Sequence, residues 1–520
     1  MEKFIDSKKA MLLIKDNDVV AVSGFAGLAV PESLLKAVEK RYLESGSPKD
    51  LTLMFAAAQG DGDCEGLNHL AHTGLVKRVI GGHFNLAPKL AKMMSNNLIE
   101  GYNFPQGVMC NIFRDIARKS EFTLSKVGLS TFIDPRIDGG KVNLLTKEDL
   151  VELVEIKDKE FLLYKHNNID IAVIKGSYCD EKGNISLDNE ATYSEAFAIA
   201  QAVKNCGGTV IVQVDEKISS DKMLCKSVKI PKIYVDYIVV VSEEEDKRQV
   251  LGKKNTPLIT AVHCDKNQTL KEEKNEGSDK ERIKVKLNAK KIIGRRAAME
   301  LKKGNIVNIG IGVPEEVSKV ADEIGMNEHI VLTVEPGPIG GIPQGGRYFG
   351  ASIKPECILD QINQFDFYDG GGLDLAFLGL AECDKNGNIN VSKFCGRLAG
   401  CGGFINITQN AKKVVFCGTF TAKGLKVDIS DGRLTIENEG QNNKFKNDVE
   451  QITFSGKMAK KLGKEVIYIT ERAVFELQED GLHLVETAPG IDIEKDILNR
   501  MEFKPVIDKD IRIMDEEIFL

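Results

Sequence analysis

The two halves of the amino-acid sequence carry the same motifs in the same order. Near residue 16 the chain reads KDNDVVAVSGFAGLAVPESLLKAV, and near residue 303 it reads KKGNIVNIGIGVPEEVSKVA. In both segments a β-rich run ends in a loop with two glycines, and a proline then precedes an acidic first helical turn. Later, GSYCDEKGNISLD at 176–188 matches GLAECDKNGNINVS at 379–392. This order predicts a duplicated fold; chance similarity between generic strand–helix units is the alternative.

Short β-rich runs alternate with helical stretches along the chain, for example DVVAVS at 18–23, TVIVQV at 209–214 and HIVLTV at 329–334. Runs that are continuous in Val, Ile and Leu are typical of parallel strands that helices cover on both faces. The pattern therefore predicts the α/β class, with two similar open-sheet domains in tandem.

The densest charge run interrupts this alternation, with SEEEDKR at 242–248 followed by KEEK at 271–274 and DKER at 279–282. Because it has little apolar surface to bury, we predict a charged linker over 241–285. An exposed helix or loop within one domain is the alternative. With a linker there, the N-terminal domain covers 1–240 and the C-terminal domain covers 286–520.

Composition excludes several classes of protein. With 520 residues, 42% of them hydrophobic and 28% charged, the chain has ample core volume and is neither a disulfide-stapled miniprotein nor disordered. Its 70 Lys and Arg oppose 77 Asp and Glu, giving a net charge of −7 with both signs interspersed. We therefore expect no nucleic-acid partner and no membrane partner. The N-terminus lacks a signal-peptide core and no apolar run is long enough to span a bilayer, so we expect a cytoplasmic protein. Its 11 cysteines mostly have apolar or glycine-rich neighbours in the sequence, so we expect reduced thiols in the core rather than disulfides or zinc ligands.

Familiar fingerprints of phosphate loops, serine nucleophile elbows, HExxH metal sites and EF-hands are absent from the sequence. His69 and His72 lie near Asp61, Asp63 and Cys64, which invites a metal-ligand interpretation. Histidines at i and i+3 beside loop carboxylates often occur without a metal, so we expect no metal site.

The most unusual segment is VLTVEPGPIGGIPQGG at 331–346. Here an apolar strand delivers one carboxylate, Glu335, just beyond its carboxyl end, at the edge where open α/β sheets bind ligands. The flanking glycines leave room for a substrate, and their N–H groups can face a developing oxyanion. A carboxylate in this place can act as a base, a metal ligand or a nucleophile. The alternative is a solvated glutamate on a surface turn.

The matching strand of the first half, LTLMFAAAQG at 51–60, carries no acid at the corresponding place. We therefore expect one active site per chain, with the first half supplying the facing wall. Two more glycine loops are expected at this edge: NIGIGVP at 308–314, whose helix N-terminus suits an anion, and LAGCGGFIN at 398–406, which can form a backbone nest. Tight packing turns are the alternative for both. In the first half, the FPQG loop presents the amide of Gln106.

These segments resemble the class I coenzyme A-transferases, most closely the single-chain acetate or propionate CoA-transferases that fuse the α and β subunits of two-subunit relatives. The resemblance covers most of the chain outside the charged run and the C-terminal tail. Its matching segments are DPRIDGG at 134–140, NFPQGV at 103–108, NIGIGVPE at 308–315, TVEPGPIGG at 333–341, QFDFYDGGGLD at 364–374 and LAGCGGFINI at 398–407.

The resemblance assigns roles to individual residues. It implies that the Glu of an E-x-G motif is the nucleophile, which is Glu335 here, with Gly337 as the motif glycine. The middle position, often Ser, Asn or Ala in the family, is Pro336. Gln106 and Gly402 are the further catalytic candidates, since they match the oxyanion or carboxylate pocket and the double glycine that lines the thioester. Residues expected to contact CoA are Asn308, Gly310, Gly312, Val313, Pro314, Gly337, Gly402 and Gly403.

The resemblance also implies a ping-pong transfer of CoA from a short-chain acyl-CoA to a free carboxylic acid, through an acyl-glutamyl anhydride and a glutamyl-CoA thioester. CoA is then a substrate, no cofactor is permanently bound, and the protein is a homodimer or homotetramer. Two alternatives stay open: an acyl-CoA hydrolase on the same fold, and a non-catalytic protein that binds acyl-CoA or sugar phosphates. Acetate, propionate, butyrate, lactate and acetoacetate all remain candidate acids.

Overall fold

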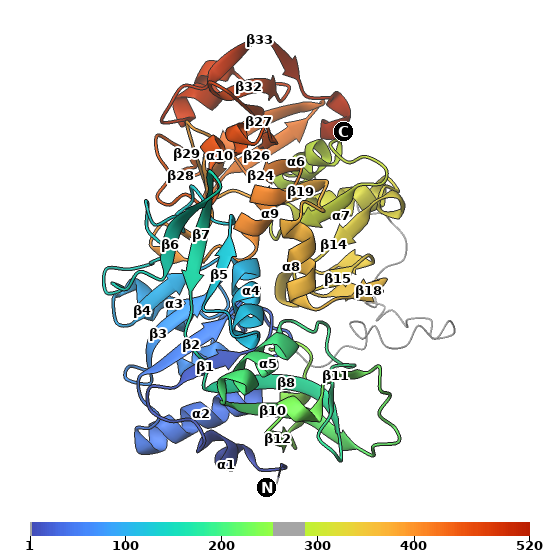
Figure 1. Ribbon diagram of the computed structural model, residues 1–520. Helices are drawn as coiled ribbons and strands as arrows, with labels where there is room; N and C mark the ends of the chain where they lie inside the picture. Colours follow the sequence, from blue (N-terminus) through green and yellow to red (C-terminus); the bar gives the residue numbers. More distant parts are fainter. Residues whose placement is uncertain (1–2, 253–286) are drawn as a thin grey trace.

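The computed structural model describes residues 3–252 and 287–520, so most of the predicted charged linker lies outside the described residues. The chain forms two halves, each built around an open sheet flanked by helices (Figure 1). Within the described ranges, no helix is both long enough and apolar enough to cross a membrane.

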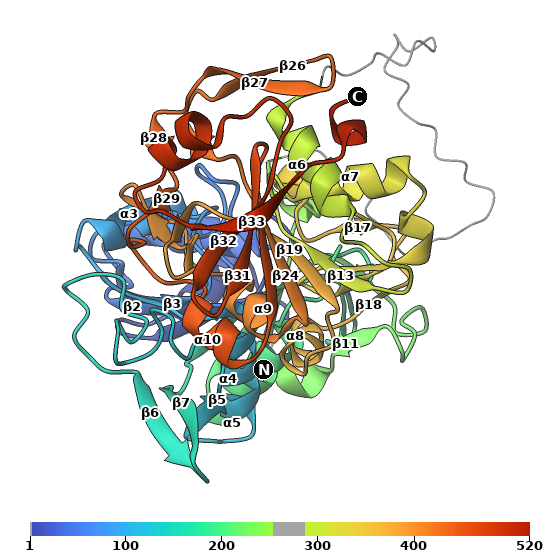
Figure 2. The same ribbon diagram turned by 90° about the horizontal axis from the view of Figure 1, so that it is seen from above.

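The first half is organised around a central parallel strand, β1 (Val19–Val22), which lies between β2 and β8. The neighbouring strands that continue the parallel sheet on either side are β2 (Leu51–Phe55), β3 (Val76–Gly81), β4 (Glu100–Asn103), β8 (Ile171–Asp180), β10 (Thr209–Ile218) and β12 (Tyr237–Val240). A separate antiparallel sheet of β5 (Phe122–Ser125), β7 (Lys159–Lys165) and β6 (Val151–Ile156) projects from this half (Figure 2).

The second half repeats this plan around β13 (Ile306–Ile309), which lies between β14 and β19. Its parallel neighbours are β14 (Val331–Thr333), β19 (Leu375–Gly379), β24 (Lys413–Cys417) and β30 (Glu465–Ile469). Antiparallel pairs extend this sheet at both ends through β15 (Pro338–Ile339), β18 (Cys357–Ile358), β31 (Ala473–Gln478) and β32 (Gly481–Thr487), with β33 (Val506–Ile513) at one edge.

The strand order confirms the predicted duplication. The order β2-β1-β8-β10-β12 in the first half equals β14-β13-β19-β24-β30 in the second. The matched GSYCD and GLAECD segments also have the same local structure, because Asp180 Oδ1 accepts the amide of Asn184 at 2.8 Å and Asp384 Oδ1 accepts that of Asn388 at 3.0 Å. Such Asp-centred turns explain why the DEKGN and DKNGN motifs survive in both copies.

Helices cover the sheets, and one set of them lies between the two halves (Figure 1). Helix α4 contacts both α5 and α8, and α8 contacts α9. Their bounds are α4 (Gln106–Ala117), α5 (Ala196–Cys206), α8 (Gln361–Asp369) and α9 (Phe404–Asn410). The outer helices are α1 (Ser7–Met11), α2 (Glu32–Ser45), α3 (Pro88–Ser95), α6 (Ala289–Ala298), α7 (Glu315–Glu323) and α10 (Gly456–Lys461).

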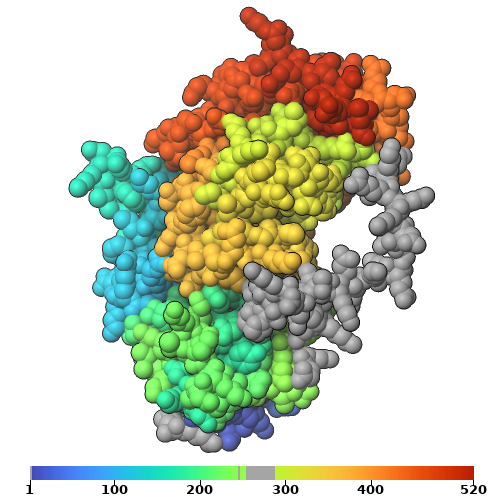
Figure 3. Space-filling model, turned by 90° about the vertical axis from the view of Figure 1, so that its right-hand side faces the viewer, coloured from blue at the N-terminus to red at the C-terminus, as the bar shows by residue number. Residues whose placement is uncertain are grey.

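A single hydrophobic core runs from one half into the other. It includes Phe113 of α4, Phe365 of α8 and Ile405 of α9, which are almost inaccessible to solvent. Burying a side chain of this size contributes roughly 1.5–3 kcal/mol, so this layer holds the halves in close contact. In the space-filling view the second half sits directly on the first (Figure 3).

Two sequence expectations need adjustment. The described part of the predicted linker is packed on the first half, since Val250 and Leu251 are buried and Lys175 Nζ donates to the carbonyl of Arg248 at 2.7 Å. The cysteines were expected mainly in the core, yet Cys64, Cys225, Cys357 and Cys395 are exposed. Their neighbours in sequence are turns and sheet edges, where a small side chain is tolerated at the surface.

Candidate active site

Glu335 lies in a tight turn just beyond the carboxyl end of β14, as the sequence predicts. The amide of Gly337 donates to the carbonyl of Val334 at 3.0 Å, and the amide of Val334 donates to the carbonyl of Pro338 at 2.9 Å. The turn reverses the chain into antiparallel β15. The Glu335 side chain, which is only partly accessible, is therefore carried by a short hairpin closed by two backbone hydrogen bonds.

The glycine of the E-x-G motif is required by its surroundings. Gly337 has φ +125°, and a Cβ there would lie 1.9 Å from the carbonyl oxygen of Leu359. The same two residues are joined by a hydrogen bond from the Leu359 amide to the Gly337 carbonyl at 2.9 Å. An L side chain at this position meets both an unfavourable backbone conformation and a collision with backbone, so the turn depends on glycine.

A threonine of the first half holds the same turn. The hydroxyl of Thr192, which is fully buried, donates to the carbonyl of Pro336. With proline at the middle position of the motif, Glu335 still lies in the turn. The carbonyl of Pro336 joins this turn to the first half. Sequence reasoning missed Thr192; the only signal was its position in TYSE, a polar segment that follows the first copy of the repeated motif.

The second glycine loop meets Glu335 directly. The backbone of Gly403 lies against the Glu335 carboxylate, since a Cβ on Gly403 would lie 2.7 Å from Glu335 Oε2, and its amide favours the charged form of that carboxylate. Burial raises the pKa of Glu335 to about 7, while the Gly403 amide opposes this shift by stabilising the charged form. The site therefore holds a desolvated carboxylate that titrates near neutral pH.

Gly402 and Gln106 lie beside this contact. The amide of Gly402 is already engaged, because it donates to the carbonyl of Gly82 at 2.7 Å, while the amide of Gln106 donates to the carbonyl of Gly402 at 2.9 Å. Of the double glycine, Gly403 is thus the one whose N–H faces Glu335. The Gln106 side chain is buried, its Oε1 lies 3.6 Å from where a Gly402 Cβ would be, and its Nε2 has no partner among the described residues.

His83 is a second residue at the site that sequence reasoning missed. Its ring carbon Cδ2 lies 3.8 Å from the position of a Cβ on Gly402. The neighbouring Phe84 amide donates to the carbonyl of Ala399 at 2.8 Å, which fixes this segment against the glycine loop. Burial, with a smaller contribution from Arg397, lowers the pKa of His83 to about 4, so its imidazole is neutral at physiological pH.

The loop at 308–314 lies at the same edge of the second sheet. Asn308 is buried and its Nδ2 donates to the carbonyl of Thr333 at 3.3 Å. The amide of Gly310 donates to the carbonyl of Phe377 at 2.8 Å. Gly312 has φ +86° and opens onto free space, while the half-buried Val313 and the buried Pro314 lead into α7.

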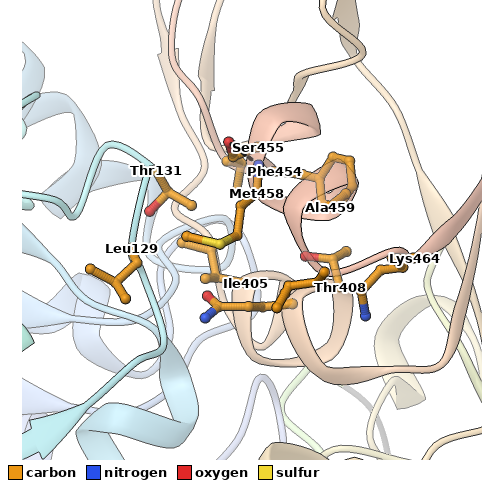
Figure 4. A pocket seen from close by; sticks show the side chains of 12 residues that line it. Leu129, Thr131, Ile405, Thr408, Phe454, Ser455, Met458, Ala459 and Lys464 are labelled. Atoms are coloured by element: carbon orange, nitrogen blue, oxygen red, sulfur yellow. Dashed lines mark hydrogen bonds between the residues drawn. The ribbon is translucent and has the colours of Figure 1, made fainter. Parts of the chain in front are cut away.

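A cavity of about 270 Å³ borders this loop. Its lining includes Ile309, Gly310 and Ile311 from the loop and Val334, the residue before Glu335. A much smaller void of about 10 Å³ lies between Leu129 of the first half and Met458 of the second (Figure 4). That void is at the limit for one water molecule, so of these two cavities the larger has room for a ligand.

The residues considered as metal ligands are split into two groups. Atoms of Asp61, Asp63 and Cys64 lie within 4.8 Å of one another, and Asp61 Oδ1 accepts the amides of the other two residues. His69 and His72 lie apart from them and pair with Glu32 and Glu39. Their carboxylate partners therefore come from α2, and the acidic loop is closed by its own backbone.

Known proteins resemble this chain over nearly its full length. A family model described as Coenzyme A transferase matches residues 5–241. The chain is 42% identical over 517 residues to "Acetate CoA-transferase YdiF" of Escherichia coli (strain K12), covering 99% of this chain and 95% of that protein. It is also 42% identical over 525 residues to "Caffeate CoA-transferase" of Acetobacterium woodii, covering 100% and 98%.

A solved structure is similar over the same length. The crystal structure of the acyl-CoA transferase YdiF from E. coli O157:H7, as a thioester complex with CoA, matches with a TM-score of 0.90 at 40% identity, covering 99% of this chain and 96% of that one. The chain belongs to the coenzyme A transferase family. Within that family it is a CoA-transferase of the single-chain type with two fused halves, as the sequence resemblance implies.

Proposed function

We propose that this enzyme moves CoA from a short-chain acyl-CoA to a free carboxylic acid, with Glu335 as the nucleophile. The observation that carries the proposal is the approach of the Gly403 backbone to the Glu335 carboxylate, beside the Gln106 side chain, whose Nε2 has no partner among the described residues. A carboxylate, a backbone donor and a side-chain donor, brought together from the two halves, are what acyl transfer through a tetrahedral intermediate requires.

In the first half-reaction, an oxygen of Glu335 attacks the thioester carbonyl carbon. The C–S bond breaks, the electron pair leaves with the CoA thiolate, and an acyl-glutamyl anhydride remains. The thiolate then attacks the glutamyl carbonyl, the first acid departs as its carboxylate, and Glu335 holds CoA as a thioester. A second carboxylate reverses these steps and leaves as the new acyl-CoA, so no proton, metal or electron is consumed overall.

Each step passes through an oxyanion that needs hydrogen-bond donors. We assign the hydrogen bonds to this oxyanion to the Gly403 N–H and the Gln106 Nε2. One well-aimed donor lowers the activation barrier by roughly 3–4 kcal/mol. The neutral ring of His83 adds no positive charge that would hold Glu335 in an ion pair. The carboxylate is therefore free to form the covalent bond.

We further propose that CoA approaches along the loop at 308–314 and its adjoining cavity. Gly312 leaves that loop open, and the helix N-terminus of α7 follows it. Because an anhydride is costly to form from a thioester, binding of the remote part of CoA is expected to lower this barrier, so short thiol fragments should lose kcat as well as affinity. The thioester complex of the E. coli relative with CoA supports this covalent route.

A short acid fits the surroundings of Glu335. A Cβ on Gly403 would lie 2.9 Å from Phe365 Cζ and 2.9 Å from Glu335 Cδ, so little space remains around the carboxylate on that side. The relatives are named for different acids, acetate and caffeate, so the preferred pair of acids is to be measured. We also propose a homodimer or homotetramer, which sedimentation of the purified protein will test.

The decisive experiment is mass analysis after incubation with acetyl-CoA or propionyl-CoA. We expect a CoA adduct on the peptide that carries Glu335, and we expect added acetate to discharge it. Glu335→Gln should abolish exchange, whereas the control Glu328→Gln, in the short 3₁₀ turn Asn327–His329, should retain it. An adduct on another residue, or unchanged exchange in E335Q, would overturn the proposal.

The same experiment separates the two alternatives. A hydrolase would lose the adduct to water at the same rate with or without acetate. A non-catalytic binding protein would form no adduct, and Glu335→Ala would leave its affinity for acyl-CoA intact.

A further inference from the structure

The contact that builds the active site occurs twice between the two halves. At the site, the amide of Gln106, the first residue of α4, donates to the carbonyl of Gly402 at 2.9 Å. On the other side of the interface, the amide of Gln361, the first residue of α8, donates to the carbonyl of Ser194 at 3.0 Å. The duplicated halves therefore meet with approximate two-fold symmetry, and each contributes one copy of the contact.

The residues that follow these two carbonyls are also equivalent. Gly403 is the N-cap of α9 and its carbonyl accepts the amide of Ile407 at 3.0 Å. Glu195 is the N-cap of α5 and its carbonyl accepts the amide of Ile199 at 3.0 Å. Glu195 thus occupies in the first half the place that Gly403 occupies in the second.

Strand register identifies the residue that matches Glu335. The amide of Thr52 donates to the carbonyl of Asp18, and the amide of Val331 donates to the carbonyl of Asn305, at the same point of the two central strand pairs. Counting four residues along each strand from these two amides pairs Ala56 with Glu335. The first half therefore has alanine where the second half has its carboxylate.

The carboxyl group has changed sides between the two copies. In the second half the strand supplies the carboxylate and the helix N-cap supplies the amide, through Glu335 and Gly403. In the first half the helix N-cap supplies the carboxyl group, Glu195, and the backbone amides of Ala56 and Gly24 at the strand ends face it. Both copies therefore place a carboxyl group against backbone amides, but the strand end and the helix N-cap have exchanged which of the two groups each supplies.

Glu195 is otherwise unexplained by the fold. It is 1% exposed, and neither carboxyl oxygen reaches hydrogen-bonding geometry with any residue that the structure describes. Burial raises its pKa to about 8, so the group is an uncharged carboxylic acid at neutral pH. A buried carboxylic acid without a full set of hydrogen-bond partners lowers the stability of the fold. Descent of this position from a duplicated carboxylate site explains why Glu195 is there.

We propose that the first half retains a second binding site for a small carboxylic acid and that the side chain of Glu195 fills it. Removing the side chain beyond Cβ deletes a –CH2–COOH group, which has the size of one acetic acid molecule. The vacated space is lined by the amides of Ala56 and Gly24, so a short monocarboxylic acid is the ligand it takes. The proposal rests on the proposed function only in treating the Glu335 copy as the active one.

The test is thermal unfolding of the full-length Glu195→Ala variant in acetate, with sodium chloride of equal ionic strength as reference. Up to about 100 mM acetate should raise the unfolding midpoint of E195A by about 2 °C more than that of wild type, by mass action on the folded state. Glu195→Gln keeps the space filled and should respond as wild type does. Because wild type and E195Q both retain Glu335, these two controls also account for acetate that binds near Glu335.

Ligand size gives an independent control. Trimethylacetate is too large for the space left by –CH2–COOH and should not raise the midpoint of E195A above that of wild type. Should E195A fail to fold, Glu195→Ser opens nearly the same space and introduces a hydroxyl at the N-cap of α5, where Glu195 makes no side-chain cap, and it should show the acetate response.

Equal acetate shifts in E195A, E195S, E195Q and wild type would overturn the proposal. So would an equal response of E195A to acetate and trimethylacetate, since a site shaped for a short acid excludes the larger one. Failure of Glu335 as nucleophile would appear instead as unchanged exchange in E335Q, and it would leave these midpoints unaffected.

Discussion

Replacing Gly403 by alanine tests whether the contact between this residue and Glu335 sustains the reaction. Gly403 has φ −80° and ψ −3°, a conformation that alanine adopts without strain. Its new Cβ, however, would lie 2.7 Å from Glu335 Oε2 and 2.9 Å from Glu335 Cδ. The same Cβ would lie 2.9 Å from Cζ of the buried Phe365, so the substitution displaces the carboxylate and also crowds the core beside it.

The size of the effect follows from these distances. Ordinary contacts of a Cβ begin at 3.4 Å, so the carboxylate must retreat by about 0.7 Å or turn away from the Gly403 amide. A displacement near 1 Å at a reacting group costs roughly 10²-fold in rate. Moving the carboxylate away from the amide of residue 403 also weakens the interaction that lowers the Glu335 pKa, so a smaller fraction of the group is ionised at neutral pH.

We expect kcat/KM for CoA transfer to fall roughly 10²-fold in G403A. Its free energy of unfolding should fall by roughly 1–3 kcal/mol, because the Cβ overpacks the core at Phe365. Gly379→Ala is the matched control, because a Cβ there has no neighbour within 4 Å at the same sheet edge. Full activity in G403A, equal to that of G379A, would refute the placement of the carboxylate against this loop.

Three other outcomes follow from the site. Gly337→Ala should lower the free energy of unfolding by roughly 3 kcal/mol or more in urea titrations, because its Cβ meets the Leu359 carbonyl at 1.9 Å; an unchanged midpoint would contradict the turn geometry. Thr192→Val should cost about 1–3 kcal/mol and reduce kcat, since the Pro336 carbonyl loses its buried donor; a purely thermal effect with normal kcat would separate this anchor from catalysis. With acyl-CoA well below saturation, the transfer rate should rise with pH through about 7, because the ionised form of Glu335 attacks and burial raises its pKa to about 7; a flat profile between about pH 5 and 8 would contradict this.

Local patterns in the chain were enough to predict the α/β class, the duplication and the place of Glu335. Buried parallel strands read as continuous runs of Val, Ile and Leu, and a repeated order of motifs predicts a repeated order of strands. The E-x-G turn is local too, since the bonds that close it join residues within four positions of one another. Such features depend on near neighbours, which the sequence displays directly.

Contacts between the halves could not be predicted in this way. Thr192 reaches Pro336 across 144 positions, and Gly107 reaches Asn406 across 299. Which glycine of the pair faces the carboxylate was equally out of reach: Gly402 turns its amide to Gly82, and only Gly403 points at Glu335. The direction of an N–H depends on backbone dihedrals that both residues are free to adopt.

The exchange of roles between Glu195 and Gly403 belongs to the same category. Aligned by eye, the first copy merely lacks an acid at the end of its second strand; the folded chain brings one there from a helix start 139 positions away from Ala56. The class of the fold and its duplication follow from residue types and their spacing along the chain. The pairing of a donor with an acceptor follows from how two packed halves orient their backbones, because burial forces each polar group to find its partner in space.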